Sequence, residues 1–273
     1  MKLAVSNIGW SADQDATISP LLLAAGAEAI EVAPSRLFAD ISAATSAQAR
    51  DIATAQSSTE LPIISMQALL FERADLRLFG EDATAQDLLA YLKHLMQLAG
   101  SLGCGPLVFG SPRNRARGSL PFRDAVGRAI PIFRAIGPIA LETGTVFCLE
   151  ANARSYRCDF MTTLAEAADV AAQVNHPRVA IVADTGNMIM EAEKSDAVLA
   201  VMDHIRHVHV SAPQLEPVTE HADYIESVLT HIFRSGYEGD ITLEMRVPEQ
   251  ADPVGTLLQN VTFLRKTIDR LVG

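Results

Sequence analysis

The chain has 273 residues, of which 49% are hydrophobic and 20% charged. This length and apolar content suit one large globular domain with a sizeable core and argue against disorder. The formal net charge of −11 disfavours general binding to nucleic acid, because the phosphate backbone would be repelled. No apolar run reaches the roughly 18 to 20 residues of a membrane span, and the N-terminal segment lacks the hydrophobic region of a signal peptide. We therefore expect a cytoplasmic protein with neither a membrane nor a nucleic-acid partner.

Eight short apolar runs of strand length recur along the chain, and longer amphipathic segments separate them. The predicted strands cover residues 3–8, 29–33, 62–68, 106–109, 146–150, 179–184, 206–210 and 240–244. The clearest predicted helices cover residues 84–102, 122–141, 162–174 and 254–271. Each strand starts about 26 to 44 residues after the previous one, which is the length of one βα unit. Eight such units predict a (β/α)₈ TIM barrel that forms a single domain over residues 1–273.

The alternative to a barrel is an open, doubly wound sheet that binds a nucleotide. Such a sheet normally has a glycine-rich, phosphate-binding turn after its first strand. The corresponding turn here is Asn7-Ile8-Gly9-Trp10, which contains neither G-x-G-x-x-G nor G-x-x-x-x-G-K. The sequence therefore favours the barrel. Its longest predicted loops follow strands three, four and five, so they would cover the C-terminal mouth, where the sites of such barrels are built.

Four consecutive predicted strands carry a metal-capable side chain at or near their C-terminal ends. The four residues are Glu150, Asp184, His209 and Glu244. The alternation of side chains along a strand places each of them on the face that lines the barrel. Three carboxylates within about 5 Å of one another would repel by roughly 3 kcal/mol per pair at an effective dielectric constant of 20.

Either one or two of these carboxylates stay protonated, or a divalent cation lies among them. Taken singly, each of the four could be a solvated carboxylate, a turn residue or a hydrogen-bonded core histidine. Four in succession favour one divalent metal ion. Three oxygen donors and one nitrogen donor suit Mn²⁺ or Mg²⁺, and we favour Mn²⁺, with Co²⁺ or Zn²⁺ as alternatives.

The sequence resembles the xylose isomerase-like TIM barrel superfamily, in particular the sugar phosphate isomerase/epimerase proteins related to D-tagatose 3-epimerase. The resemblance covers essentially the whole chain. Its moderately specific segments are IEVAP at residues 30–34, SMQAL at 65–69 and VFGSPRNR at 108–115. Its specific part is the ordered series of Glu, Asp, His and Glu in LEAN at 149–152, ADTG at 183–186, HVHVS at 207–211 and LE at 243–244.

The resemblance implies that all four residues of this series bind one divalent metal ion. It also implies that Glu150 and Glu244 act as acid and base on a ketose-type sugar or sugar phosphate. Proton abstraction next to the carbonyl would give an enediolate, and return of the proton would complete an isomerisation or epimerisation. The epimerases have a histidine three residues after the metal-binding aspartate, whereas this chain has Asn187. This difference leaves the identity of the sugar open.

Two other functions fit the same residues. A dehydratase of an inosose-like ketone would use the same metal and the same proton abstraction but would expel hydroxide. A noncatalytic, sugar-binding barrel would retain the metal for structure or sensing. A trinuclear zinc nuclease is disfavoured, because the third strand offers Gln67 and the fourth ends in Gly110-Ser111, where endonuclease IV relies on further histidines.

Further polar residues near the predicted mouth complete the candidate site. The candidates for substrate contact are Glu31, Gln67, Arg113, Arg115, Asn152, Asn187 and Arg246. Glu31 could instead form a buried ion pair, and the basic cluster around Arg113 could hold a phosphate or carboxylate or pair with neighbouring acids. His207 lies one layer deeper than His209 and is expected to support the metal site from outside the ligand set. The predicted partner is a small sugar or sugar phosphate, and the resemblance admits a homo-oligomer.

Overall fold

A computed structural model describes residues 1–247 and 252–272, and in it eight parallel strands form a closed barrel in sequence order. The strands are β1 (Leu3–Ser6), β2 (Ala29–Val32), β3 (Ile63–Met66), β4 (Pro106–Phe109), β5 (Val146–Glu150), β6 (Val179–Asp184), β7 (Ile205–Val210) and β8 (Ile241–Leu243). Each lies within its predicted range or extends it by one residue. The predicted TIM barrel is therefore confirmed.

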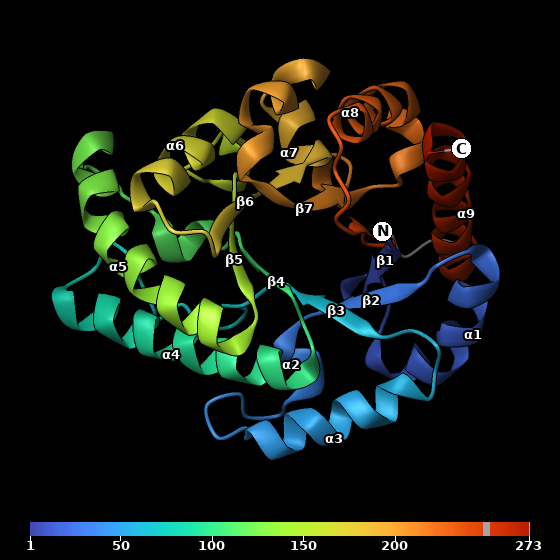
Figure 1. Cartoon of the computed structure of the whole chain (residues 1–273), viewed down its shortest axis with the longest axis horizontal. Helices are drawn as coiled ribbons and strands as arrows, with labels where there is room; N and C mark the ends of the chain where they lie inside the picture. Colours follow the sequence, from blue (N-terminus) through green and yellow to red (C-terminus); the bar gives the residue numbers. More distant parts are fainter. Residues whose placement is uncertain (248–251, 273) are drawn as a thin grey trace.

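Helices form a ring around the outside of the barrel (Figure 1). The longer helices are α1 (Asp15–Ala25), α3 (Ser46–Ser57), α4 (Asp82–Leu102), α5 (Phe122–Thr143), α6 (Leu164–Val174), α8 (Ala222–Arg234) and α9 (Pro253–Val272). Two short helices, α2 (Pro34–Leu37) and α7 (Thr185–Met190), directly follow β2 and β6, and a 3₁₀ segment (Ser195–His204) precedes β7. None of the helices in the described part of the chain combines the length and apolarity that a membrane crossing requires.

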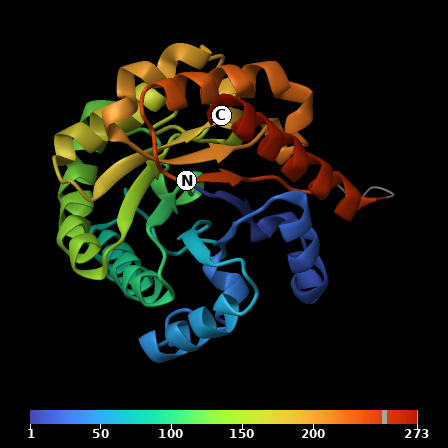
Figure 2. The same ribbon diagram turned by 45° about the vertical axis from the view of Figure 1, so that its right-hand side comes forward.

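The ends of the chain close the barrel. β1 pairs with β8, so that Leu3 lies opposite Ile241 and Val5 opposite Leu243. Outside this junction α9, drawn in red, packs beside α1, drawn in blue (Figures 1 and 2). The first and last elements of the barrel are therefore neighbours in space.

The strands are short and apolar because helices cover their outer face while side chains fill the barrel inside. Phe147 on β5 points outward and packs with Phe109 and Phe133, with ring centroids 5.3 to 5.9 Å apart. Cys148, the next residue, points inward into a small cluster of buried side chains that includes Val182. This alternation confirms the predicted parity and directs Glu150 toward the barrel axis.

The register of the parallel strands brings their carboxyl ends together at one rim. Asp184 lies opposite His209, and Val210 lies opposite Leu243. The backbone nitrogen of Glu244 donates to the carbonyl oxygen of Val210 at 3.0 Å, which fixes the first residue after β8 at the same rim. Residues that are far apart along the chain therefore reach the same end of the barrel.

The aromatic cluster outside β4 and β5 should contribute strongly to stability. Phe147→Ala removes a fully buried ring, so we expect the free energy of unfolding to fall by about 3–5 kcal/mol. Leu141→Ala, on an exposed position of α5, should change it by less than about 0.5 kcal/mol. Urea unfolding followed by circular dichroism measures both, and equal losses in the two variants would contradict the packing described.

Candidate metal centre

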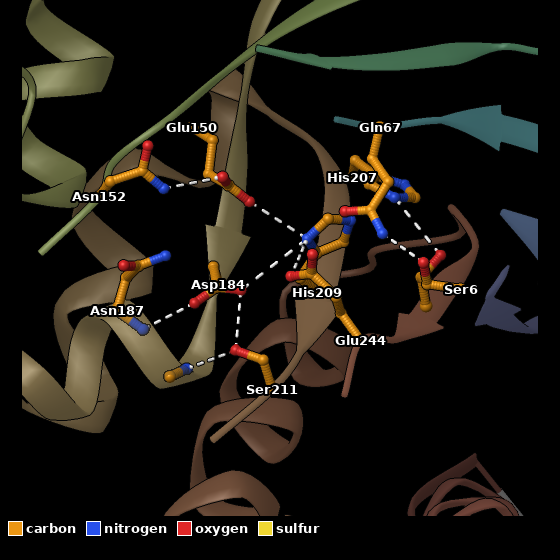
Figure 3. Close-up of polar contacts among 12 residues, drawn as sticks. Ser6, Gln67, Glu150, Asn152, Asp184, Asn187, His207, His209, Ser211 and Glu244 are labelled. Carbon is orange, nitrogen blue, oxygen red and sulfur yellow. Dashed lines mark hydrogen bonds and ion pairs between the residues drawn. The ribbon is translucent and has the colours of Figure 1, made fainter. Parts of the chain in front are cut away.

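Four side chains from consecutive strands meet at the C-terminal rim of the barrel (Figure 3). They are Glu150, Asp184, His209 and Glu244, and their potential ligand atoms all lie within 4.8 Å of one another. The Nδ1 atom of His209 is 3.1 Å from Glu150 Oε1, 3.2 Å from Glu244 Oε2 and 3.8 Å from Asp184 Oδ2. The structure thus brings together the four residues that the sequence predicts as ligands.

Asp184 is held in place by the start of α7 and by the loop after β7. It is the N-cap of α7, where its Oδ1 accepts a hydrogen bond of 2.6 Å from the backbone nitrogen of Asn187. Its Oδ2 accepts a bond of 2.8 Å from Ser211 Oγ, which also accepts from the backbone nitrogen of Gly186. A Cβ atom on Gly186 would lie 2.4 Å from Ser211 Oγ. The glycine therefore allows the close approach that positions the carboxylate.

His209 is supported from below by Glu31 and His207. Glu31 Oε1 lies 3.0 Å from His209 Nε2, and Glu31 Oε2 lies 2.8 Å from His207 Nε2. When the imidazole is neutral, a carboxylate at Nε2 favours the tautomer that carries its proton there, which leaves the Nδ1 lone pair facing the three acids. Burial would raise the pKa of Glu31, but the two imidazoles lower it well below its usual range.

The crowding and burial of the cluster raise the pKa of two of its acids. Burial, together with the charges of Glu150 and Glu244, raises the pKa of Asp184 to about 7. Burial also raises the pKa of Glu244. Burial would lower the pKa of His209, but the carboxylates of Glu31 and Glu244 raise it well above the usual value. In the absence of a metal ion, the cluster therefore retains protons near neutral pH.

The donor set fits a divalent metal ion. Glu150 Oε1 and His209 Nδ1 are buried and lack a hydrogen-bond partner among the described residues, although they face one another across the cluster. Unpaired buried polar atoms are costly, and a cation between them would satisfy both. Three carboxylates and one imidazole nitrogen are a suitable set for Mn²⁺ and are compatible with Mg²⁺, Co²⁺ or Zn²⁺.

A cavity of about 650 Å³ opens at this cluster, and its lining includes all three acids of the cluster, Glu150, Asp184 and Glu244. The loops after β3, β4, β5 and β7 supply most of the remaining lining, including the side chains of Phe71 and Tyr156. A second cavity of about 310 Å³ also reaches Glu150 and Glu244. Volumes in this range accommodate small organic ligands.

Five of the seven predicted substrate contacts line these cavities. They are Gln67, Arg113, Asn152, Asn187 and Arg246. The other two, Glu31 and Arg115, are fully buried and belong to neither lining. Glu31 forms the buried ion pair that the sequence left as its alternative, and Arg115 donates to the backbone oxygen of Glu150 and to Asn152. The charged groups of Glu31 and Arg115 therefore contact other protein groups and do not face a cavity. His207 contacts Glu31 and lies outside the four-residue cluster, but together with Glu31 and His209 it forms a second buried group whose potential ligand atoms lie within 4.8 Å of one another.

Two residues of the site have no role in the sequence-based prediction. Ser211 orients Asp184, as described above. Gly110 directly follows β4, and a Cβ atom there would lie 2.4 Å from Glu150 Oε2 and 3.1 Å from Asn152 Oδ1. The only signal for either residue in the sequence is its place at the end of a strand, within a segment that carries the resemblance.

Comparison with known proteins places the chain in a family. The family model described as Xylose isomerase-like TIM barrel matches residues 20–267. The chain belongs to this family. No curated protein matches the sequence.

Solved structures with the same fold include sugar epimerases. The 3-keto-D-glucoside 4-epimerase of E. coli is 18% identical and aligns with a TM-score of 0.77 over 97% of this chain and 99% of its own. D-psicose 3-epimerase of Clostridium cellulolyticum H10, solved with D-tagatose, is 17% identical. It aligns with a TM-score of 0.74 over 99% of this chain and 98% of its own. The IOLI protein, solved with a zinc atom, is 14% identical and aligns with a TM-score of 0.70 over 100% of this chain and 98% of its own. At these identities the likeness establishes the fold.

The space at Gly110 should be needed for binding a divalent cation. In Gly110→Ala the new methyl group displaces the flexible carboxylate of Glu150, so we expect the dissociation constant for Mn²⁺ to rise roughly 10- to 100-fold while the fold is retained. Gly127→Ala serves as the control, because a Cβ atom on that residue of α5 meets nothing within 4 Å. Isothermal titration calorimetry measures both, and unchanged affinity in Gly110→Ala would contradict the geometry.

The raised pKa of Asp184 should make the metal-free protein less stable as the pH rises. The unfolded chain releases this proton near pH 4 and the folded chain near pH 7, so the folded state binds more protons between these values and its stability falls through this range. One pKa unit corresponds to about 1.4 kcal/mol, so the loss reaches at most about 4 kcal/mol.

Asp184→Asn removes this titration. In EDTA the variant should therefore be more stable than the wild type at pH 8, and the difference should shrink toward pH 4. Asp169→Asn, on an exposed position of α6, should keep the pH dependence of the wild type. Urea unfolding at both pH values tests this, and a wild-type pH dependence in Asp184→Asn would be evidence against the crowding of the acids.

Proposed function

We propose that the protein is a divalent-metal-dependent isomerase or epimerase that acts on a small sugar or sugar phosphate with a ketose-type carbonyl. The observation that carries this proposal is the cluster of three acids and one imidazole at the wall of a cavity of about 650 Å³. The fold shared with sugar epimerases supports it, among them a D-psicose 3-epimerase solved with D-fructose and an L-ribulose 3-epimerase.

Glu150, Asp184, His209 and Glu244 would hold the ion. A bound divalent cation supplies Lewis-acid stabilisation of the negative charge that develops on substrate oxygens. Asp184 has both oxygens engaged by hydrogen bonds from Asn187 and Ser211, so its role is to hold the ion in place.

Glu150 and Glu244 move the proton in this proposal. Both line the two cavities, and each has one oxygen within 3.2 Å of His209 Nδ1. One carboxylate removes a proton from the carbon next to the carbonyl, and the other returns a proton to the substrate. Two carboxylates from non-adjacent strands, β5 and the end of β8, can flank a sugar that lies between them.

The cavity offers groups that would orient the substrate. Asn187 and Tyr156 are suited to hydroxyl groups, and the exposed guanidinium groups of Arg113 and Arg246 are suited to a phosphate or carboxylate. The resemblance implies that Asn187 stands where the epimerases have a histidine. Its Oδ1 accepts from the backbone nitrogen of Ala153 at 2.9 Å, so its amide NH₂ group is the part that would contact a substrate oxygen.

Solvent hydrogen exchange into a ketose tests this function. With Mn²⁺ bound, the protein should incorporate deuterium from D₂O into at least one sugar of a panel of free and phosphorylated ketoses, and EDTA should abolish the uptake. Glu150→Gln and Glu244→Gln should each slow it by about 10²- to 10⁴-fold, because each removes an acid–base group. Glu216→Gln, an exposed position in the loop after β7, is the matched control. ¹H NMR follows the uptake; its absence with every sugar would overturn the proposed function.

A further inference from the structure

Arg115 is a buried cation beside the candidate metal centre. It lies at the end of the 3₁₀ turn Pro112–Arg115 that follows β4, and it is fully buried. Its Nη2 donates to the backbone oxygen of Glu150 at 2.8 Å and to Asn152 Oδ1 at 2.6 Å. Its Nε and Nη1 have no hydrogen-bond partner among the described residues. Burying a guanidinium group with two nitrogens that lack such a partner costs free energy of folding, which suggests that the contacts of Nη2 serve the neighbouring site.

The first consequence of Arg115 is that the amide of Asn152 has one orientation. Arginine carries only donors, so the oxygen of the amide must face Arg115. The Nδ2 atom then points the other way and donates to Glu150 Oε2 at 2.9 Å (Figure 3). A flipped amide would place NH₂ against the guanidinium group and oxygen against the carboxylate, and both contacts would be repulsive.

The second consequence is that the two oxygens of Glu150 have different tasks. Oε2 is held by Asn152 and lies in the space that Gly110 leaves free. Oε1 faces His209 Nδ1 at 3.1 Å and has no hydrogen-bond partner of its own among the described residues. The chain of contacts from Arg115 through Asn152 therefore fixes the orientation of the Glu150 carboxylate, with one oxygen at Asn152 and the other facing the centre of the cluster.

We propose that Arg115 is a positioning residue, which acts through Asn152 to aim Glu150 at the bound metal ion. The inference rests on the proposed function, because it takes Glu150 as a metal ligand. It gives the last arginine of the SPRNR segment, residues 111–115, a role inside the protein, while Arg113 of the same segment faces the cavity.

The test is Mn²⁺ binding to metal-free protein, measured by isothermal titration calorimetry. Arg115→Met and Asn152→Leu should each raise the dissociation constant roughly 10- to 100-fold, the range for groups that orient a metal ligand. The double variant should bind no more weakly than the weaker single variant, because the two residues act in series. The electron paramagnetic resonance spectrum of bound Mn²⁺ should change in the same way in both single variants. A residue that only supports the fold would leave this spectrum unchanged.

Arg134→Met is the matched control. Arg134 on α5 also donates to backbone oxygens, those of Gln173 and Val174, but it lies outside both cavity linings, so its loss should leave the affinity at the wild-type value. If Arg115→Met does not fold, Arg115→Lys takes its place, since it keeps a cation at this position but lacks the guanidinium fork that contacts Glu150 and Asn152. Wild-type affinity in both single variants, or additive losses in the double variant, would overturn this inference and leave the metal centre standing. A wild-type chain that binds no Mn²⁺ would overturn both.

Discussion

The crowding of three carboxylates around one imidazole nitrogen is the constraint on which the rest of the site depends. Glu150, Asp184 and Glu244 each approach His209 Nδ1 to within 3.8 Å at a mostly buried rim. Without a metal ion the cluster is accommodated by retaining protons, whereas a divalent cation would allow its carboxylates to be charged together. The surrounding contacts are arranged accordingly, because each of them fixes the direction of a donor atom. Glu31 faces Nε2 of His209, Ser211 and the start of α7 hold Asp184, and Asn152 holds Glu150.

The barrel could be predicted from the sequence because its signals are local. Each strand is a short apolar run, and the spacing between runs is that of a βα unit. The four candidate ligands could be predicted for a related reason. Strand parity decides which way a terminal side chain points, and the carboxyl ends of parallel strands in a barrel share one rim. Glu150 and Asp184, the final residues of β5 and β6, are the clearest examples.

The roles of the supporting residues could not be predicted in this way, because they depend on contacts between loops. Arg115 is one of several arginines in a basic segment, and nothing in its neighbours distinguishes a buried side chain from one that faces the cavity. Glu31 has the parity of a barrel-lining residue, but only the structure shows that two imidazoles occupy both of its oxygens. Gly110 is needed because a Cβ atom at this position would collide with the carboxylate of Glu150. That residue lies 40 positions later in the chain, so the steric requirement is not visible in the local sequence.

The pairing of β1 with β8 has a consequence for how the protein is made. During synthesis on a ribosome, the edge of β1 that pairs with β8 stays unpaired until β8 has emerged. Glu244 directly follows that last strand, so an intermediate without β8 would lack one of the four candidate ligands. The complete set of four would thus form only when the barrel has closed.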